Sequence, residues 1–169
     1  MERFLSTSPS ETIRFARSFA SSLKRNAVVT LIGDLGSGKT QFVKGVCQYF
    51  RVRDSVASPT FVMLHRYVGL DRKNEELLLY HFDLYKVKAA SEILELGYEE
   101  FLRGDGICLI EWADKLQHLT PGDRIEVQFS LGHAENERQI VVEKYSETVT
   151  KDAPRGGTMK NVRREFSRY

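Results

Sequence analysis

The sequence predicts an α/β fold in which helices flank a mixed central sheet. Two short apolar runs, at residues 26–32 and 107–110, have the composition of buried strands in a parallel sheet. Two further pairs of apolar runs are each joined by a short polar segment, which is typical of an antiparallel hairpin. Because helical patterns alternate with strands of both kinds, a mixed sheet is favoured over a purely parallel one.

The N-terminal part of the chain alternates between helical and extended patterns. Residues 8–11 read Ser-Pro-Ser-Glu, a capping box with proline at the first helical position, so a helix is expected to begin there. Apolar residues then recur at helical spacing through about residue 24. The strand predicted at 26–32 ends at a glycine, and after a glycine-rich turn the next helix is expected over residues 40–50.

The rest of the chain predicts two hairpins, a helix and a second buried strand. These elements are expected in the following order: a hairpin of residues 61–68 and 77–83, a helix over 89–96 with Gly97 as its C-cap, a strand over 107–110, and a hairpin of residues 125–131 and 138–145.

Length and charge predict one folded domain and a separate basic tail. The chain has 169 residues, enough for one hydrophobic core, and we assign residues 1–149 to this domain. Residues 150–169 contain six Lys or Arg against two acidic residues, a net charge of +4. Since the whole chain carries +2, the domain carries −2. We therefore expect a flexible tail, whose charge would suit contact with an anionic partner.

Other features of the composition place the chain in the cytoplasm. No apolar run is long enough to cross a membrane, and the N-terminus lacks the apolar region of a signal peptide. The two cysteines, Cys47 and Cys108, have neither a metal-binding spacing nor the number needed for a disulfide framework. A cytoplasmic protein without a membrane partner is the expectation.

A phosphate-binding motif follows the first predicted strand. The pattern G-x-x-x-x-G-K-[ST] is matched by residues 33–40, between a strand and a helix, as the motif requires. Glycines allow the backbone N–H groups to surround phosphate oxygens, and the N-terminus of the helix adds positive potential. In such a loop Lys39 reaches the β- and γ-phosphates and the Thr40 hydroxyl binds Mg²⁺. The fold class is therefore a P-loop NTPase.

Acidic and hydroxyl side chains elsewhere are candidates for the same site. Glu111 follows four apolar residues at the end of a second buried strand, where a carboxylate near the metal is expected. His81 and Asp83 project from one face of a strand, and either face the nucleotide or are ordinary polar residues at a strand end. Thr60 lies after the P-loop helix, where switch segments place a hydroxyl, although from the residues alone a simple turn before a strand explains it better.

Five short motifs occur in an order that resembles one protein family. They are GDLGSGKT (33–40), SPTF (58–61), HFDLYK (81–86), ELGYEEFL (95–102) and IEW (110–112). Together they resemble the bacterial TsaE family, also called YjeE, over roughly residues 8–145. The resemblance implies an ATPase of the tRNA N6-threonylcarbamoyladenosine system that acts with TsaD and TsaB, while tRNA is contacted indirectly or through the basic tail. Ser37 and Lys86 depart mildly from the family pattern, and neither change removes a ligand.

The resemblance also implies roles for individual residues. Lys39, Asp83 and Glu111 would be catalytic, and Thr40, Glu111 and Asp83 would surround Mg²⁺. The residues expected to bind ATP are Gly33, Asp34, Leu35, Gly36, Ser37, Gly38, Lys39, Thr40, Thr60 and Trp112.

Three other functions compete with this one. A GTPase is disfavoured because the chain contains neither N-K-x-D nor D-x-x-G. A small-molecule kinase would need an arginine-bearing lid, and residues 111–120 contain no arginine. A non-catalytic, nucleotide-dependent binding switch stays open. Since no arginine finger or catalytic glutamine is identifiable, turnover of the isolated protein is expected to be slow and stimulated by partners.

Overall fold

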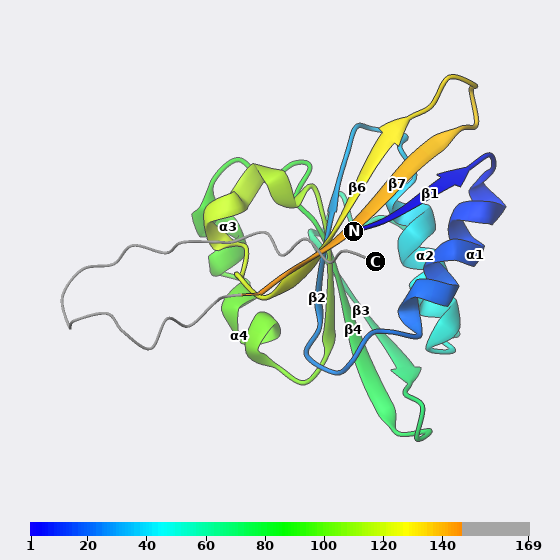
Figure 1. Cartoon of the computed structure of the whole chain (residues 1–169). Helices are drawn as coiled ribbons and strands as arrows, with labels where there is room; N and C mark the ends of the chain where they lie inside the picture. The colour runs from blue at the N-terminus through cyan, green and yellow to red at the C-terminus, as the bar shows by residue number, and fades with distance from the viewer. Residues whose placement is uncertain (147–169) are drawn as a thin grey trace, which may run out of the picture.

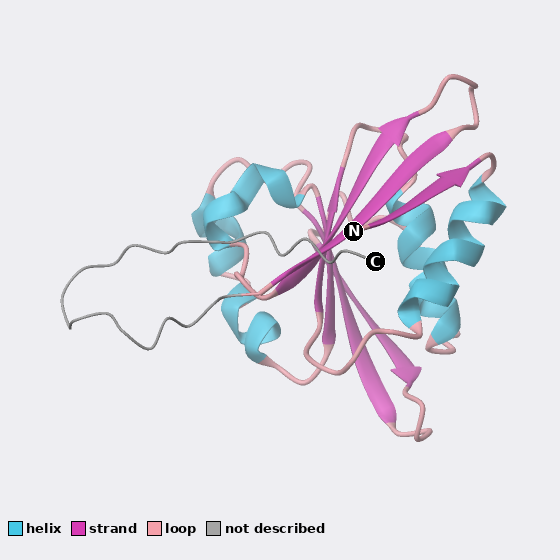
Figure 2. Ribbon diagram, in the orientation of Figure 1, coloured by secondary structure: helices cyan, strands magenta, loops and turns pink. Residues whose placement is uncertain are grey.

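A seven-stranded sheet with helices on both faces forms the body of the protein (Figures 1 and 2). The structure is a computed structural model that describes residues 1–146, so the tail predicted for 150–169 lies outside the described residues. The strands are β1 (Glu2–Ser6), β2 (Val28–Ile32), β3 (Leu64–Leu70), β4 (Glu76–Asp83), β5 (Ile107–Glu111), β6 (Arg124–Leu131) and β7 (Arg138–Tyr145). The helices are α1 (Pro9–Ala20), α2 (Lys39–Tyr49), α3 (Ala90–Leu94), α4 (Tyr98–Arg103) and the 3₁₀ helix η1 (Ala113–Leu119).

The sheet is mixed, which confirms the predicted fold class. Its strand order is β1-β7-β6-β2-β5-β4-β3. The four inner strands β6, β2, β5 and β4 run parallel, and β3 and β7 pair antiparallel with their neighbours as the two predicted hairpins. The first strand, β1, was not predicted, and it pairs antiparallel with β7 at one edge of the sheet.

Helix α1 begins where the capping box predicted. The Ser8 hydroxyl accepts the backbone N–H of Glu11 at 3.2 Å, and the Glu11 carboxylate accepts the backbone N–H of Thr7 at 2.7 Å. The helix ends at Ala20, a turn earlier than expected, because the chain bends there to enter β2. Leu23 lies beyond the end of the helix but within the stretch whose apolar residues recur at helical spacing, and its side chain is buried.

Helices α1 and α2 pack together on one face of the sheet, on the right in Figure 1. At the centre of this layer the ring of Phe42 lies against Phe15, Phe19 and Phe129, with centroids 5.2 to 6.2 Å apart. The two helices approach closely at Gly45, where a Cβ atom would lie 2.3 Å from the carbonyl oxygen of Ile13. This packing fixes the helix that carries the phosphate-binding motif.

The opposite face is covered by short helices, and here the predicted boundaries were wrong. The single helix expected over 89–96 is a five-residue α3, and a further helix, α4, follows it. The C-cap of α3 is Glu95 rather than the predicted Gly97. Gly97 has a left-handed φ of 79°, donates its backbone N–H to Leu94 and is the N-cap of α4. The side chains of Phe82, Ile110 and Tyr98 form the core beneath these helices. The short η1 was also not predicted.

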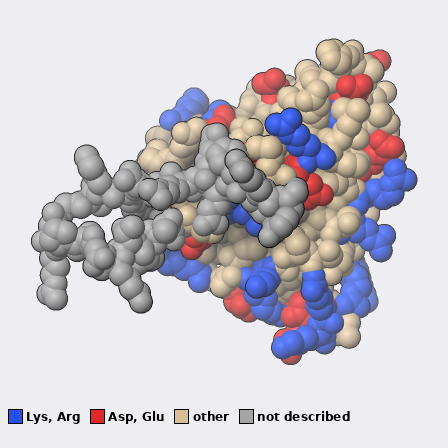
Figure 3. All heavy atoms as spheres, in the orientation of Figure 1, with Lys and Arg blue, Asp and Glu red and all other residues tan. Residues whose placement is uncertain are grey.

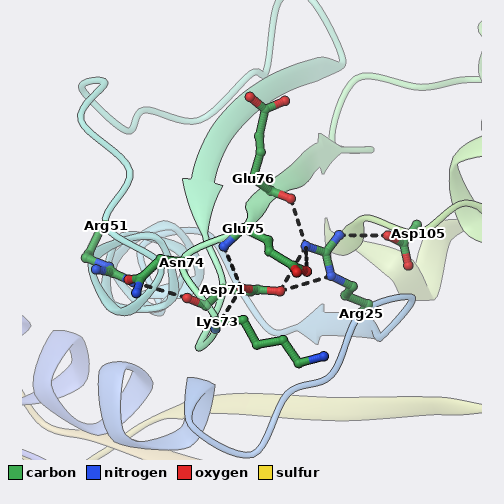
Figure 4. Close-up of polar contacts among 8 residues, drawn as sticks. All are labelled: Arg25, Arg51, Asp71, Lys73, Asn74, Glu75, Glu76 and Asp105. Carbon is green, nitrogen blue, oxygen red and sulfur yellow. Dashed lines mark hydrogen bonds and ion pairs between the residues drawn. The ribbon is translucent and has the colours of Figure 1, made fainter.

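The β3–β4 hairpin is fastened to the body of the protein by Arg25 (Figure 4). The guanidinium donates twice to the Asp71 carboxylate, at 2.9 and 3.1 Å, and once to Asp105 at 2.7 Å. Backbone N–H groups and Arg25 hold the pKa of Asp71 below its usual range. Acidic and basic side chains mix around this end of the molecule (Figure 3). No helix in the described residues has the length and apolar character needed to cross a membrane.

Candidate nucleotide-binding site

The predicted phosphate-binding loop connects β2 to α2. Gly38, the N-cap of α2, has a left-handed φ of 103°, which few residues other than glycine adopt. Gly33 has a φ of 149°, and a Cβ atom there would lie 2.5 Å from the carbonyl oxygen of Phe129. The first free N–H groups of α2 therefore point into a loop with little side-chain bulk, an arrangement suited to an anion.

Lys39 is folded into this loop and is only 4% exposed. Its ammonium group donates to the carbonyl oxygens of Gly33 at 2.7 Å and of Asp34 at 2.9 Å. It also lies 3.8 Å from the centre of the Trp112 ring. Burial lowers the pKa of Lys39, and the nearby carboxylates of Glu111 and Asp83 oppose that shift. The cation is held by neutral carbonyl oxygens, which phosphate oxygens can replace.

Glu111 reaches the start of α2 from the end of β5. It is 3% exposed, and its Oε1 accepts the Thr40 hydroxyl at 2.8 Å. His81 Nε2 lies 2.9 Å from the same oxygen. The carboxyl ends of parallel strands meet at one edge of a sheet, so Glu111 lies directly beside Asp83 of β4 in the strand register. Side chains from three separate segments of the chain, α2, β4 and β5, thus converge around the N-terminus of α2.

Asp83 anchors the segment that follows α2. One of its oxygens accepts the hydroxyls of Ser58 and Thr60, the latter at 2.6 Å, and the other accepts the Tyr85 backbone N–H at 2.9 Å. His81 and Asp83 share the face covered by α2, while Phe82 packs on the opposite face, as the strand alternation predicted. Both oxygens of Asp83 therefore accept hydrogen bonds from protein donors, whereas the bonds from Thr40 and His81 to Glu111 both reach Oε1.

Trp112 adopts a backbone conformation that is unusual for a large residue. Its φ of 59° is left-handed, and its backbone N–H donates to the carbonyl oxygen of Leu31 at 3.0 Å. The turn brings the indole ring beneath the Lys39 ammonium group, and the Tyr85 ring contacts it in a tilted arrangement with centroids 4.9 Å apart. Strained backbone of this kind is common at functional sites.

These residues line one cavity of about 370 Å³. Of the residues named from the sequence, the lining includes Leu35, Gly36, Ser37, Gly38, Lys39, Thr40, Thr60, Asp83, Glu111 and Trp112. Gly33 and Asp34 contribute through the carbonyl oxygens that hold Lys39. The structure thus brings the predicted site residues together, while their roles stay predictions.

The cavity also has lining residues that sequence reasoning missed. They are Pro9, Thr12, Gln41, Ser58, Tyr85, Asn136 and Arg138. The Arg138 guanidinium donates to the carbonyl oxygen of Gly36 at 3.1 and 3.3 Å, across 102 residues of sequence. Gln41, Ser58 and Tyr85 lie one or two residues from the predicted site residues Thr40, Thr60 and Asp83. The others lie on α1, β7 and the β6–β7 turn, which come together at the cavity through the pairing of β1 with β7 that the sequence did not predict.

The donor groups in the cavity suit Mg²⁺ bound together with a phosphate. The described residues contain no cluster of three or more His, Cys, Asp or Glu side chains able to enclose a metal alone. Mg²⁺ is usually held by one or two protein oxygens, waters and substrate phosphates rather than by a protein cage. The Thr40 hydroxyl and the Glu111 carboxylate supply such oxygens at the end of the phosphate-binding loop.

Comparison with known proteins identifies the family. The family described as threonylcarbamoyl adenosine biosynthesis protein TsaE matches residues 6–140. The tRNA threonylcarbamoyladenosine biosynthesis protein TsaE of Rickettsia bellii is 45% identical over 125 residues, 73% of this chain and 83% of that protein. The Bacillus subtilis protein of the same name is 35% identical over 139 residues, 82% of each chain.

A solved structure agrees with this match. The crystal structure of Bacillus subtilis YdiB superposes with a TM-score of 0.69 at 30% sequence identity, over 85% of this chain and 84% of that one. The sequence family and the fold therefore lead to the same result. The chain belongs to the TsaE family, whose members are involved in the biosynthesis of tRNA threonylcarbamoyladenosine.

Proposed function

We propose that this protein is a Mg²⁺-dependent ATPase that acts with TsaD and TsaB in the threonylcarbamoylation of tRNA. The observation that carries the proposal is the contact between Thr40 and Glu111, 2.8 Å apart across 71 residues of sequence. It joins the phosphate-binding loop to a carboxylate on the neighbouring parallel strand, the arrangement that P-loop ATPases need around the metal. Family membership supports the link to tRNA modification.

Each group has a role in this proposal that follows from its position. Lys39 would leave the carbonyl oxygens of Gly33 and Asp34 and neutralise charge on the β- and γ-phosphates. Thr40 and Glu111 would hold Mg²⁺, which bridges phosphate oxygens and offsets the charge that develops during phosphoryl transfer. Asp83 keeps the hydroxyls of Ser58 and Thr60 at the cavity.

The isolated protein is expected to turn over slowly. Arg138 is the one arginine that lines the cavity in the described part of the chain, and its guanidinium is bonded to Gly36 and to two carbonyl oxygens of the β6–β7 turn. An arginine supplied by a partner can accelerate such a reaction by about 10³- to 10⁵-fold. Stimulation by the TsaD and TsaB proteins is therefore part of the proposal.

Measurement of Mg·ATP binding and hydrolysis by Lys39→Ala tests this function. In this proposal Lys39 binds the phosphates, so its loss should abolish binding or turnover while circular dichroism shows an intact fold. Lys44→Ala is the matched control, because Lys44 lies on the same helix but does not line the cavity. Equal binding and turnover in Lys39→Ala and the parent protein would refute the nucleotide site.

A binding switch without turnover is the second candidate, and one feature favours it. The Thr60 hydroxyl is bonded to Asp83 in the cavity, whereas the next side chain, Phe61, is 87% exposed. A ligand that displaces Thr60 would move an exposed aromatic ring on the surface. Nucleotide-dependent retention of TsaD and TsaB without phosphate release, even in the complete assembly, would favour this candidate. The kinase alternative gains no support, since residues 113–119 form the short η1 without an arginine.

A further inference from the structure

His81 is a buried side chain with a single hydrogen bond, to the carboxylate of Glu111. It is 0% exposed, and its Nε2 lies 2.9 Å from Glu111 Oε1. Its other ring nitrogen, Nδ1, is the one buried side-chain nitrogen or oxygen without a hydrogen-bond partner among residues 1–146. The ring does not line the cavity, so a bound ligand would not reach it.

The unpartnered Nδ1 determines which ring nitrogen donates. An ionised carboxylate only accepts hydrogen bonds, so the contact with Glu111 requires a hydrogen on Nε2. A second hydrogen on Nδ1 would bury an N–H group without an acceptor, which is costly. His81 therefore donates from Nε2 and carries a bare lone pair on Nδ1.

The contact also restricts the orientation of the Glu111 side chain. The Thr40 hydroxyl and His81 Nε2 both bond to Oε1, at 2.8 and 2.9 Å, which leaves Oε2 available to a ligand. The Thr40 hydroxyl is itself a proposed Mg²⁺ ligand, so its geometry changes when nucleotide binds. His81 lies on β4, the strand beside that of Glu111, and is buried away from the cavity. Its hydrogen bond to Glu111 therefore does not depend on a ligand.

We propose that His81 is a positioning residue that holds the Glu111 carboxylate in the orientation required for Mg²⁺-dependent nucleotide binding and hydrolysis. The proposal rests on the function proposed above. Mutation of a residue that orients a metal-binding side chain typically lowers metal affinity or activity by about ten- to a hundredfold. A purely structural histidine is a poor explanation, because an apolar side chain would fill the same position without an unpartnered nitrogen.

Three substitutions separate positioning from packing. His81→Gln keeps an N–H group that can reach Oε1, His81→Asn is shorter, and His81→Leu has no donor. Mg²⁺ should strengthen ADP binding at least tenfold less in His81→Leu than in the parent protein. The turnover rate with partners should fall by a similar factor. ADP affinity in EDTA should stay within about twofold, and the melting temperature should be unchanged or higher. His81→Gln should restore most of the loss, and His81→Asn less.

Two comparisons make the experiment specific to Glu111. His65→Leu is the matched control, because His65 lies opposite His81 in the β3–β4 register but bonds to Tyr67 rather than to Glu111. In a Glu111→Gln background, His81→Leu should have no further effect on the Mg²⁺ dependence, since positioning acts only through that carboxylate. Additive losses in the double variant would overturn the proposal.

The test also distinguishes this proposal from the proposed function. NMR of the histidine ring nitrogens in the ligand-free protein should show that His81 carries its hydrogen on Nε2. The Nε2 signal should shift in the Glu111→Gln variant. Parent protein that binds no Mg·ADP would refute the proposed function even with this signature present. Parent protein that binds Mg·ADP, together with an unaffected His81→Leu variant, would overturn the positioning role alone.

Discussion

Gly45 lies where α2 crosses α1. Replacing it with alanine has two opposing effects on stability: alanine favours the helix, but its Cβ atom collides with α1. In a helix interior, alanine is more favourable than glycine by about 1 kcal/mol of helix-forming free energy, so Gly45→Ala would stabilise an isolated α2. In the folded protein the new Cβ would lie 2.3 Å from the Ile13 carbonyl oxygen and 2.6 Å from the Ala16 Cβ. Carbon atoms in contact are normally about 3.5 to 4.0 Å apart, so the helices must separate by about 1 Å.

The cost of the collision with α1 should exceed the gain in helix propensity. Overpacking costs about 1 to 3 kcal/mol, and the upper end applies because the obstructing atoms belong to the backbone and Cβ of α1, which have no alternative rotamer. Subtracting the helix preference leaves Gly45→Ala less stable by about 2 kcal/mol. For a chain of this size that corresponds to a melting temperature lower by about 4 to 8 °C.

Urea unfolding followed by circular dichroism measures this difference directly. Gln48→Ala is the matched control, because Gln48 is exposed on the same helix and its replacement should change stability by less than about 0.5 kcal/mol. A Gly45→Ala protein as stable as the parent, or more stable, would show that the helices separate without cost and would refute the reasoning.

The other predictions concern the candidate site and the tail. Glu111→Gln should retain some nucleotide affinity but lose most Mg²⁺-dependent turnover, and the same loss should follow removal of Mg²⁺ by EDTA; parent-level hydrolysis would make Glu111 structural. Asp83→Asn should have a smaller effect, measured in the same assay, because both Asp83 oxygens accept hydrogen bonds from protein donors, whereas those to Glu111 reach Oε1 only. Trp112 fluorescence should change on addition of Mg·ADP in the parent and not in Lys39→Ala; no change while calorimetry detects binding would remove Trp112 from the site. Truncation after residue 149 should leave ATP hydrolysis unchanged but weaken salt-sensitive binding to tRNA, if the basic charge there contacts phosphates.

Features encoded by adjacent residues were predictable. The phosphate-binding loop combines a buried strand, glycines at fixed spacing and a helix start, and all of these are local patterns. Glu111 was recognisable because it ends a fully apolar strand. The two hairpins followed from alternating runs joined by polar turns, and the structure has both.

Features created by contacts between distant segments were not predictable. Strand β1 has only five residues, three of them polar or charged, and it forms because β7 offers an unpaired edge. Arg138 reaches the phosphate-binding loop because β7 is held beside β6, and β6 beside β2. The helix expected over 89–96 was misjudged because Gly97 suits the start of a helix as well as an end.

The pairing of β1 with β7 has a consequence for how the protein folds during synthesis. The first and last strands of the described chain lie side by side, and the cavity is lined both by Pro9 and Thr12 and by Asn136 and Arg138. A ribosome releases the N-terminal segment long before β7, so β1 has no partner until nearly the whole domain has been translated. Contacts of such large sequence separation slow folding. The candidate nucleotide-binding cavity is thus among the last parts of the domain to be completed, and a nascent chain lacks part of the cavity lining until its final strand is in place.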